Sequence, residues 1–104
     1  MLIERCFTCS TAHITRRDSE ILNKETERDA TDIALVAYRK GDWGYFIHVP
    51  LDAESLKIMV RQVKENGYSE AVVKLLEAAH NEKCEWLQLD TDEERIDGFE
   101  TFDW

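Results

Sequence analysis

The sequence predicts one α+β domain, with three helices on one side of a small mixed or antiparallel sheet in two layers. Three observations support this. The 104 residues have the length of a single domain, 1–104, and the 43% hydrophobic content suffices for one core. Segments rich in β-branched and aromatic residues alternate with segments of helical periodicity, in the order β-α-β-β-α-α-β. Each predicted helix has one apolar stripe and therefore needs a sheet face to cover.

The N-terminal part predicts a strand and a capped helix. Residues 2–10, LIERCFTCS, predict the strand. Thr15 predicts the N-cap, because Asp18 follows at the spacing of a capping box, and the helix continues to about Thr26. A hairpin follows: residues 32–39 and 43–49, DIALVAYR and WGYFIHV, are separated by KGD, whose glycine permits a tight turn.

Two amphipathic helices come next. Asp52 predicts the first N-cap, Asn66-Gly67 predicts a left-handed end, and Ser69 starts the second helix. The connection is so short that the two helices must pack side by side. Apolar residues recur at i, i+3, i+4 and i+7 in both helices. The residues predicted to be mostly buried are Leu56, Met59, Val60, Val63, Val72, Leu75, Leu76 and Leu87.

The C-terminal part predicts a strand and an acidic, aromatic tail. In CEWLQLDTD, residues 84–92, Leu87 and Leu89 share one side of the strand, and Trp86 and Gln88 share the other. A solvated acidic tail carries few aromatic residues. We therefore expect residues 86–104 to fold back on the core; docking into a partner is the alternative. The aromatic residues of the tail are Phe99, Phe102 and Trp104.

Charge is concentrated in the same tail. The net charge is −9, and residues 90–104 contain seven acidic residues against one arginine. Such an end repels a phosphate backbone, which argues against direct nucleic-acid binding and favours a basic protein surface as partner. The candidate binding residues are Asp90, Asp92, Glu93, Glu94 and Asp97 together with the three tail aromatics.

The chain has no apolar run long enough to cross a bilayer, and its first residues do not resemble a signal peptide. We therefore expect a cytoplasmic protein with no membrane partner. Three cysteines are an odd number, and in a reducing compartment they are expected to be free thiols. The oligomeric state is not predicted by the sequence.

The segment CFTCSTAHIT, residues 6–15, raises the question of a metal site. Cys6, Cys9 and His13, completed by His80 and Cys84, offer zinc ligands. In an extended strand, however, Cys6 and Cys9 point to opposite faces. We therefore predict no metal, and no cofactor is indicated.

The same segment permits a catalytic alternative, in which Cys9 or Cys6 is a nucleophile and His13 or His48 its base. We favour a scaffold in which the polar side chains satisfy the N–H groups at the helix start. Arg16 and Arg17 oppose the helix dipole in the first turn. They could therefore bind an anion there, or pair with the acidic tail.

The motifs CSTAHIT at 9–15 and CEWLQLDTDEERIDGFETFDW at 84–104 resemble a family of small uncharacterised proteins. Bacterial plasmids, integrative elements and phages carry its members. They share STAHIT after a first strand, an aromatic hairpin like WGYFIHV, and a terminal aromatic-D-W such as FDW. The resemblance implies a mobile-element origin and an accessory role, and it supplies neither an activity nor catalytic residues. The linking sequence ERIDGFE is more acidic here than the family pattern.

These observations lead to two functional hypotheses. The first is a non-enzymatic acidic interaction protein of a mobile genetic element, which inhibits a host defence or nucleic-acid-binding protein. The alternative is a small enzyme or ligand-binding domain that uses the corner formed by Cys9, His13 and Arg16.

Overall fold

The computed structural model describes residues 5–27, 37–40 and 44–102, and it confirms the α+β class and the predicted order of elements. A short 3-10 helix, η1, follows the first strand and was not predicted. The elements are β1 (Cys6–Ser10), η1 (Thr11–His13), α1 (Arg16–Glu27), β2 (Ala37–Lys40), β3 (Gly44–His48), α2 (Ala53–Glu65), α3 (Glu70–Asn81) and β4 (Trp86–Asp90).

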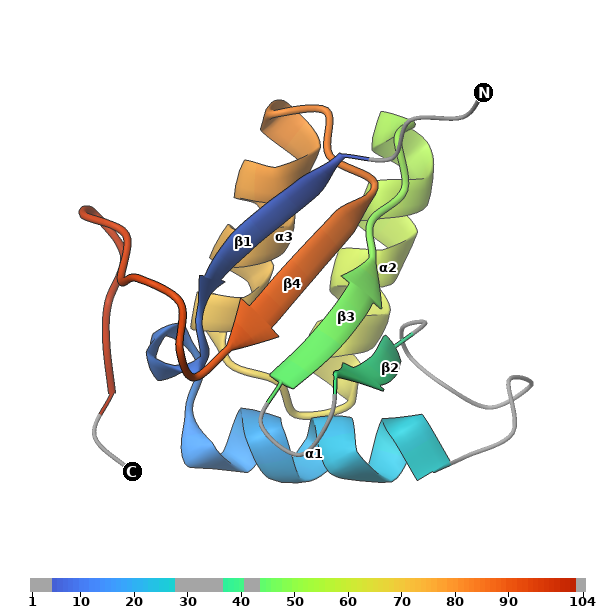
Figure 1. Cartoon of the computed structure of the whole chain (residues 1–104). Coiled ribbons are helices and arrows are strands. Elements are labelled where there is room, and N and C mark those ends of the chain that lie inside the picture. The colour runs from blue at the N-terminus through green and yellow to red at the C-terminus, as the bar shows by residue number, and fades with distance from the viewer. Residues whose placement is uncertain (1–4, 28–36, 41–43, 103–104) are drawn as a thin grey trace.

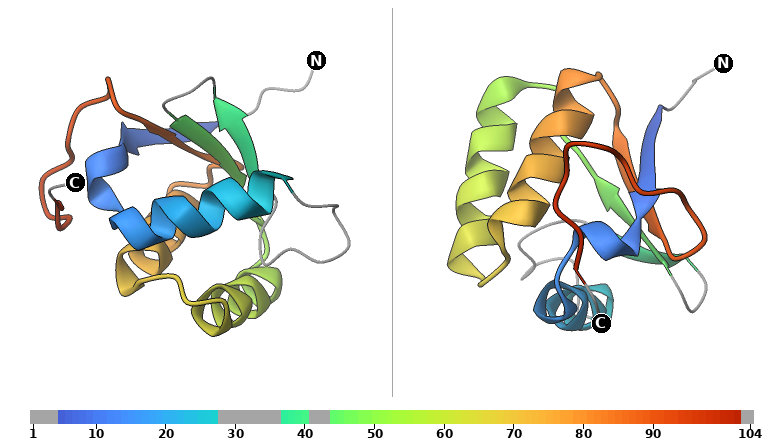
Figure 2. Two further views of the ribbon diagram at one scale, coloured as in Figure 1. Left: turned by 90° about the horizontal axis from the view of Figure 1, so that it is seen from below. Right: turned by 90° about the vertical axis from the view of Figure 1, so that its left-hand side faces the viewer.

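The four strands form one mixed sheet in the order β1-β4-β3-β2. β1 runs parallel to β4, whereas β4–β3 and β3–β2 are antiparallel. Figure 1 shows α2 and α3 side by side across one face of the sheet, with α1 crossing its lower end. The two views in Figure 2 confirm that α2 and α3 form one layer and the sheet forms the other. No helix among the described elements covers the opposite sheet face.

The core lies between these layers. Leu87 and Leu89 of β4 are fully buried against it, as the predicted alternation requires. Seven of the eight residues predicted to be buried are buried. The exception is Val60, which is partly buried and packs against the core from its edge.

Polar caps fix the helix starts. Thr15 and Asp18 form the predicted capping box: the Asp18 backbone N–H donates to Thr15 Oγ1, and the Thr15 N–H donates to Asp18 Oδ2. The Asp18 carboxylate is fully buried and also accepts from the Ser69 N–H at 2.8 Å and the Ser69 hydroxyl at 2.6 Å. One side chain therefore joins the start of α1 to the start of α3.

The other predicted boundaries are close to the observed ones. Asp52 caps α2 by accepting from the Ser55 N–H, which lowers the pKa of its carboxyl group. Gly67 has φ of +92°, the predicted left-handed end of that helix. The predicted hairpin is β2 and β3, but residues 32–36 of its first strand and the turn at 41–43 lie outside the described residues. None of the described helices has the length and apolarity that crossing a membrane requires.

Candidate functional site

His13 connects the two sequence motifs, because its imidazole binds the C-terminal tail on both sides. The Ile96 N–H donates to His13 Nε2 at 2.8 Å. The Glu100 carbonyl lies 3.0 Å from His13 Nδ1. A carbonyl oxygen can only accept and a backbone N–H can only donate, so in this arrangement Nδ1 donates and Nε2 accepts. The imidazole is 1% exposed and makes an edge-on contact with Phe99, with 5.9 Å between ring centroids.

Two backbone hydrogen bonds extend this attachment. The Ser10 N–H donates to the Glu94 carbonyl at 3.2 Å, and the Phe102 N–H donates to the Ala12 carbonyl at 2.8 Å. Ile96 and Phe99 pack against the core. In Figure 1 the tail leaves the lower end of β4 and passes the outer side of β1. The predicted fold-back of the tail is therefore confirmed as far as Phe102, while Trp104 lies outside the described residues.

The folded tail turns its carboxylates outward. Five of its acidic residues are exposed, and Asp90 at the end of β4 is partly buried. Asp90 Oδ1 accepts from the Asp92 N–H at 3.0 Å, which shapes the turn after the strand. Phe102 is partly buried. The surface formed by Asp92, Glu93, Glu94, Asp97 and Glu100 is called the acidic rim below.

The two arginines at the start of α1 contact different parts of the helical layer. Arg16 pairs with Glu20 one turn along the same helix, with 3.6 Å between Nε and Oε1, and both side chains are exposed. The guanidinium of Arg17 lies against Gly67 in the turn between α2 and α3. A Cβ at that glycine would lie only 3.4 Å from Arg17 Nη2. The structure thus gives each arginine a contact within the helical layer.

The cysteines of the corner occupy opposite sides of β1, as expected from the strand geometry. Cys9 is fully buried in the core, whereas Cys6 is exposed on the other face. Burial, with a smaller contribution from the charge of Glu93, raises the pKa of the Cys9 thiol to about 12. This thiol therefore stays protonated at neutral pH and is a poor nucleophile. Among the described residues, no three His, Cys, Asp or Glu side chains gather as a metal-binding group.

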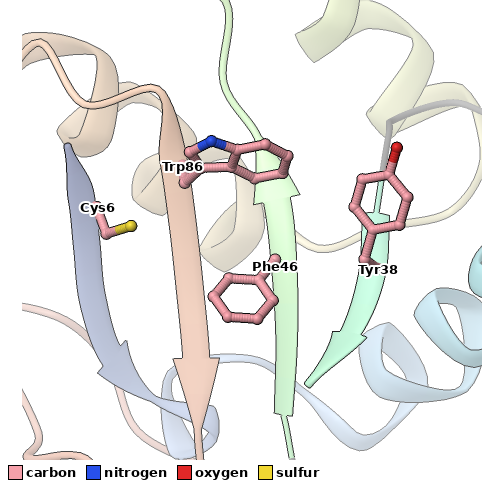
Figure 3. Close-up of a pocket in the computed structure, with 4 residues that line it drawn as sticks. All are labelled: Cys6, Tyr38, Phe46 and Trp86. Carbon is pink, nitrogen blue, oxygen red and sulfur yellow. The ribbon is translucent and has the colours of Figure 1, made fainter. Parts of the chain in front are cut away.

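A second feature lies on the sheet face that α2 and α3 leave uncovered. Figure 3 shows Cys6, Trp86, Phe46 and Tyr38 projecting from four neighbouring strands, where they line a cavity of about 290 Å³. Trp86 lies 6.1 Å from Tyr38 and 6.5 Å from Phe46, measured between ring centroids. The sequence placed Trp86 opposite the core but did not identify this cavity. The alternation of Phe46 with buried Tyr45 and Ile47 is the pattern that could have revealed it.

Comparison with known protein families gives a match, which covers nearly the whole chain. Residues 6–104 match the model of the C-terminal domain of a family of unknown function, DUF5983. The chain belongs to this family. No curated protein and no solved structure matches it. The family therefore contributes no established activity, and functional proposals for this DUF5983 domain depend on its geometry.

Proposed function

We propose that this domain is a non-enzymatic interaction protein whose acidic rim binds a basic surface on another protein. The observation that carries the proposal is the attachment of the tail to the corner. His13 and the backbone of Ser10 and Ala12 hold the tail in one conformation while its carboxylates stay exposed. A surface fixed before binding loses less conformational entropy on association than a flexible acidic tail does.

Charge placement supports the same proposal. The last fifteen residues contribute −6 of the net −9, so the negative potential is concentrated on one side of the chain. Concentrated charge accelerates encounter with an oppositely charged partner and sets its orientation. The partner class that fits is a protein with a basic site, such as one that binds nucleic acid.

The contacts at the corner favour binding over catalysis. The Cys9 thiol is buried and protonated, and both ring nitrogens of His13 are engaged by the tail. A general base needs a free nitrogen within reach of its substrate. The mobile-element origin and the inhibition of a host defence protein remain part of this proposal. The mobile-element origin rests on the resemblance of the STAHIT and FDW motifs, and the inhibition of a host defence protein rests on the acidic surface.

Charge neutralisation tests the proposal. The rim variant carries Asp92→Asn, Glu93→Gln, Glu94→Gln and Asp97→Asn. The matched control carries Glu54→Gln, Glu65→Gln, Glu77→Gln and Glu82→Gln, all on exposed positions of the helical layer or its ends. Both variants have the same net charge. Immobilised protein is used to capture partners from a bacterial lysate, and candidates are then measured as purified proteins.

The expected result is a partner that binds the unsubstituted domain and the control, and binds the rim variant at least tenfold more weakly. Raising the salt concentration should weaken the binding, because exposed charges are screened. Equal loss in both variants would show that only net charge matters, and equal retention in both would remove the rim from the interface. Either result contradicts the proposal.

A further inference from the structure

The cavity on the open sheet face is built from paired strand positions. The pairing register aligns Cys6, Trp86 and His48 in one row, and Phe46 and Tyr38 in the next. The rings of Phe46 and His48 stand at 84° and 81° to that of Trp86. Tyr38 is 57% exposed although it belongs to a strand. The three rings that line the cavity are those of Tyr38, Phe46 and Trp86, and the Tyr38 ring is tilted at 49° to that of Trp86.

The open face differs in charge from the rest of the molecule. The register places Thr8, Gln88 and the aromatic residues on it, and among its described side chains Asp90, at the lower end, is the one carboxylate. The chain as a whole has 22 acidic and 13 basic residues. The cavity therefore presents uncharged ring faces inside a strongly negative molecule. Both features attract a cation, because the ring faces carry partial negative charge and the field of the chain adds to it.

Two other occupants fit less well. The sheet face has four strands about 4.8 Å apart, each of about five residues that rise about 3.3 Å per residue. A second copy of the chain, packed face to face, would therefore bury roughly 300 Å² per partner. Stable interfaces bury about 800 Å² per partner. Single-stranded nucleic acid stacks on such aromatic platforms, but it requires a positively charged groove. The net charge of −9 opposes it.

We propose that this cavity binds the guanidinium group of an arginine side chain from a basic protein partner. The inference rests on the proposed function and names a second contact for the same class of partner. Arginine fits better than lysine because its planar group stacks on aromatic rings and is less strongly hydrated than an ammonium group. The methylene stem of the arginine covers the apolar edge of the cavity beside Cys6.

The cavity and the acidic rim are within reach of one partner. Trp86 and Asp90 are the two ends of β4 and are separated by roughly 13 Å of extended strand. The acidic turn begins directly after Asp90, at the lower end of the sheet in Figure 1. A basic segment of about four extended residues spans that separation. An arginine in the cavity and a second cation at the rim can therefore belong to one peptide.

Small probes test the cavity without involving the rim. Acetyl-arginine amide and acetyl-citrulline amide have nearly the same shape, but only the first is charged. Each is titrated into the whole chain, and the indole N–H resonance of Trp86 is followed by NMR. We expect arginine to bind about threefold more tightly than citrulline, the range of a solvent-exposed cation–π contact. In Trp86→Leu, where the ring resonances of Tyr38 and Phe46 are followed instead, this preference should be lost. The rim variant should retain it.

Uniform incorporation of 5-fluorotryptophan provides a second measurement that does not depend on the folding of Trp86→Leu. Fluorine withdraws electron density from the ring with little change in shape, so arginine binding should weaken while citrulline binding stays the same. Equal binding of the two probes, or no shift at Trp86 with either, overturns the inference. If the cavity fails this test while the rim variant still loses its partner, the proposed function stands alone.

Discussion

The tail-covered corner and the open sheet face both include parts of β1 and β4, yet they differ in charge and in aromatic content. At the corner, polar atoms of η1 and the tail bind one another across more than 80 residues of sequence, and carboxylates point outward. On the open face, exposed Tyr38 and partly buried Phe46 and Trp86 line a cavity, and charge is nearly absent. The contrast shows that exposed carboxylates are crowded on the tail and are nearly absent from the described side chains of the open sheet face. Acidity required only for solubility needs no such separation.

Removing residues 96–104 should produce the largest effect on the free energy of unfolding. It removes the tail from the corner and leaves the open sheet face in place. The deletion removes the apolar contacts of Ile96 and Phe99 and three hydrogen bonds to the corner. Partial burial of two side chains and three hydrogen bonds together stabilise the fold by about 4 kcal/mol. We expect that loss in urea denaturation, with the cavity around Trp86 still present in the folded fraction.

The rim variant described above is the control for this deletion, since it keeps the backbone and apolar contacts of the tail. Its stability should equal or slightly exceed that of the unsubstituted protein, because repulsion between neighbouring carboxylates is relieved. If the deletion costs no more than this variant, the tail is not part of the fold and the comparison of two fixed surfaces fails.

The alkylation rates of Cys6 and Cys9 compare the two sides of β1 directly. Cys6 lies on the open face, and Cys9 lies beneath the corner with its pKa raised to about 12. At pH 8 the thiolate fraction of Cys9 is about 10⁻⁴. As long as the pH is below the pKa, this fraction increases about tenfold for each unit by which the pH is raised. Iodoacetamide should therefore modify Cys6 at least 100-fold faster than Cys9, as measured by peptide mass spectrometry. Comparable rates in the native protein would show that the corner opens readily.

Local patterns predicted the fold well because its elements depend on neighbours in sequence. The capping box of Thr15 and Asp18 and the left-handed Gly67 need only a few adjacent residues. The alternation in β4 likewise placed Leu87 in the core. The second role of Asp18 was not predictable, because its partner Ser69 lies 51 residues away and no local pattern joins the two.

Only part of the candidate site could be predicted from the sequence, because its other contacts join residues that are far apart along the chain. The aromatic residues of the tail predicted its fold-back, but nothing local assigned His13 to hold it, since its contacts lie 83 and 87 residues along the chain. The cavity was missed because Phe46 and Trp86 belong to strands with apolar residues on both faces. Which face the helices cover follows from the three-dimensional arrangement.

Amide hydrogen exchange at Ile96 and Phe102 tests the central claim, that the corner holds the acidic tail in one conformation. Both N–H groups donate to the corner, Ile96 to His13 and Phe102 to Ala12. We predict that both exchange at least about 100-fold more slowly than in an unstructured peptide. In His13→Ala the protection of Ile96 should be lost, whereas His48→Ala on the open face should leave it unchanged. Exchange of both amides at the unstructured rate in the unsubstituted protein would contradict the account.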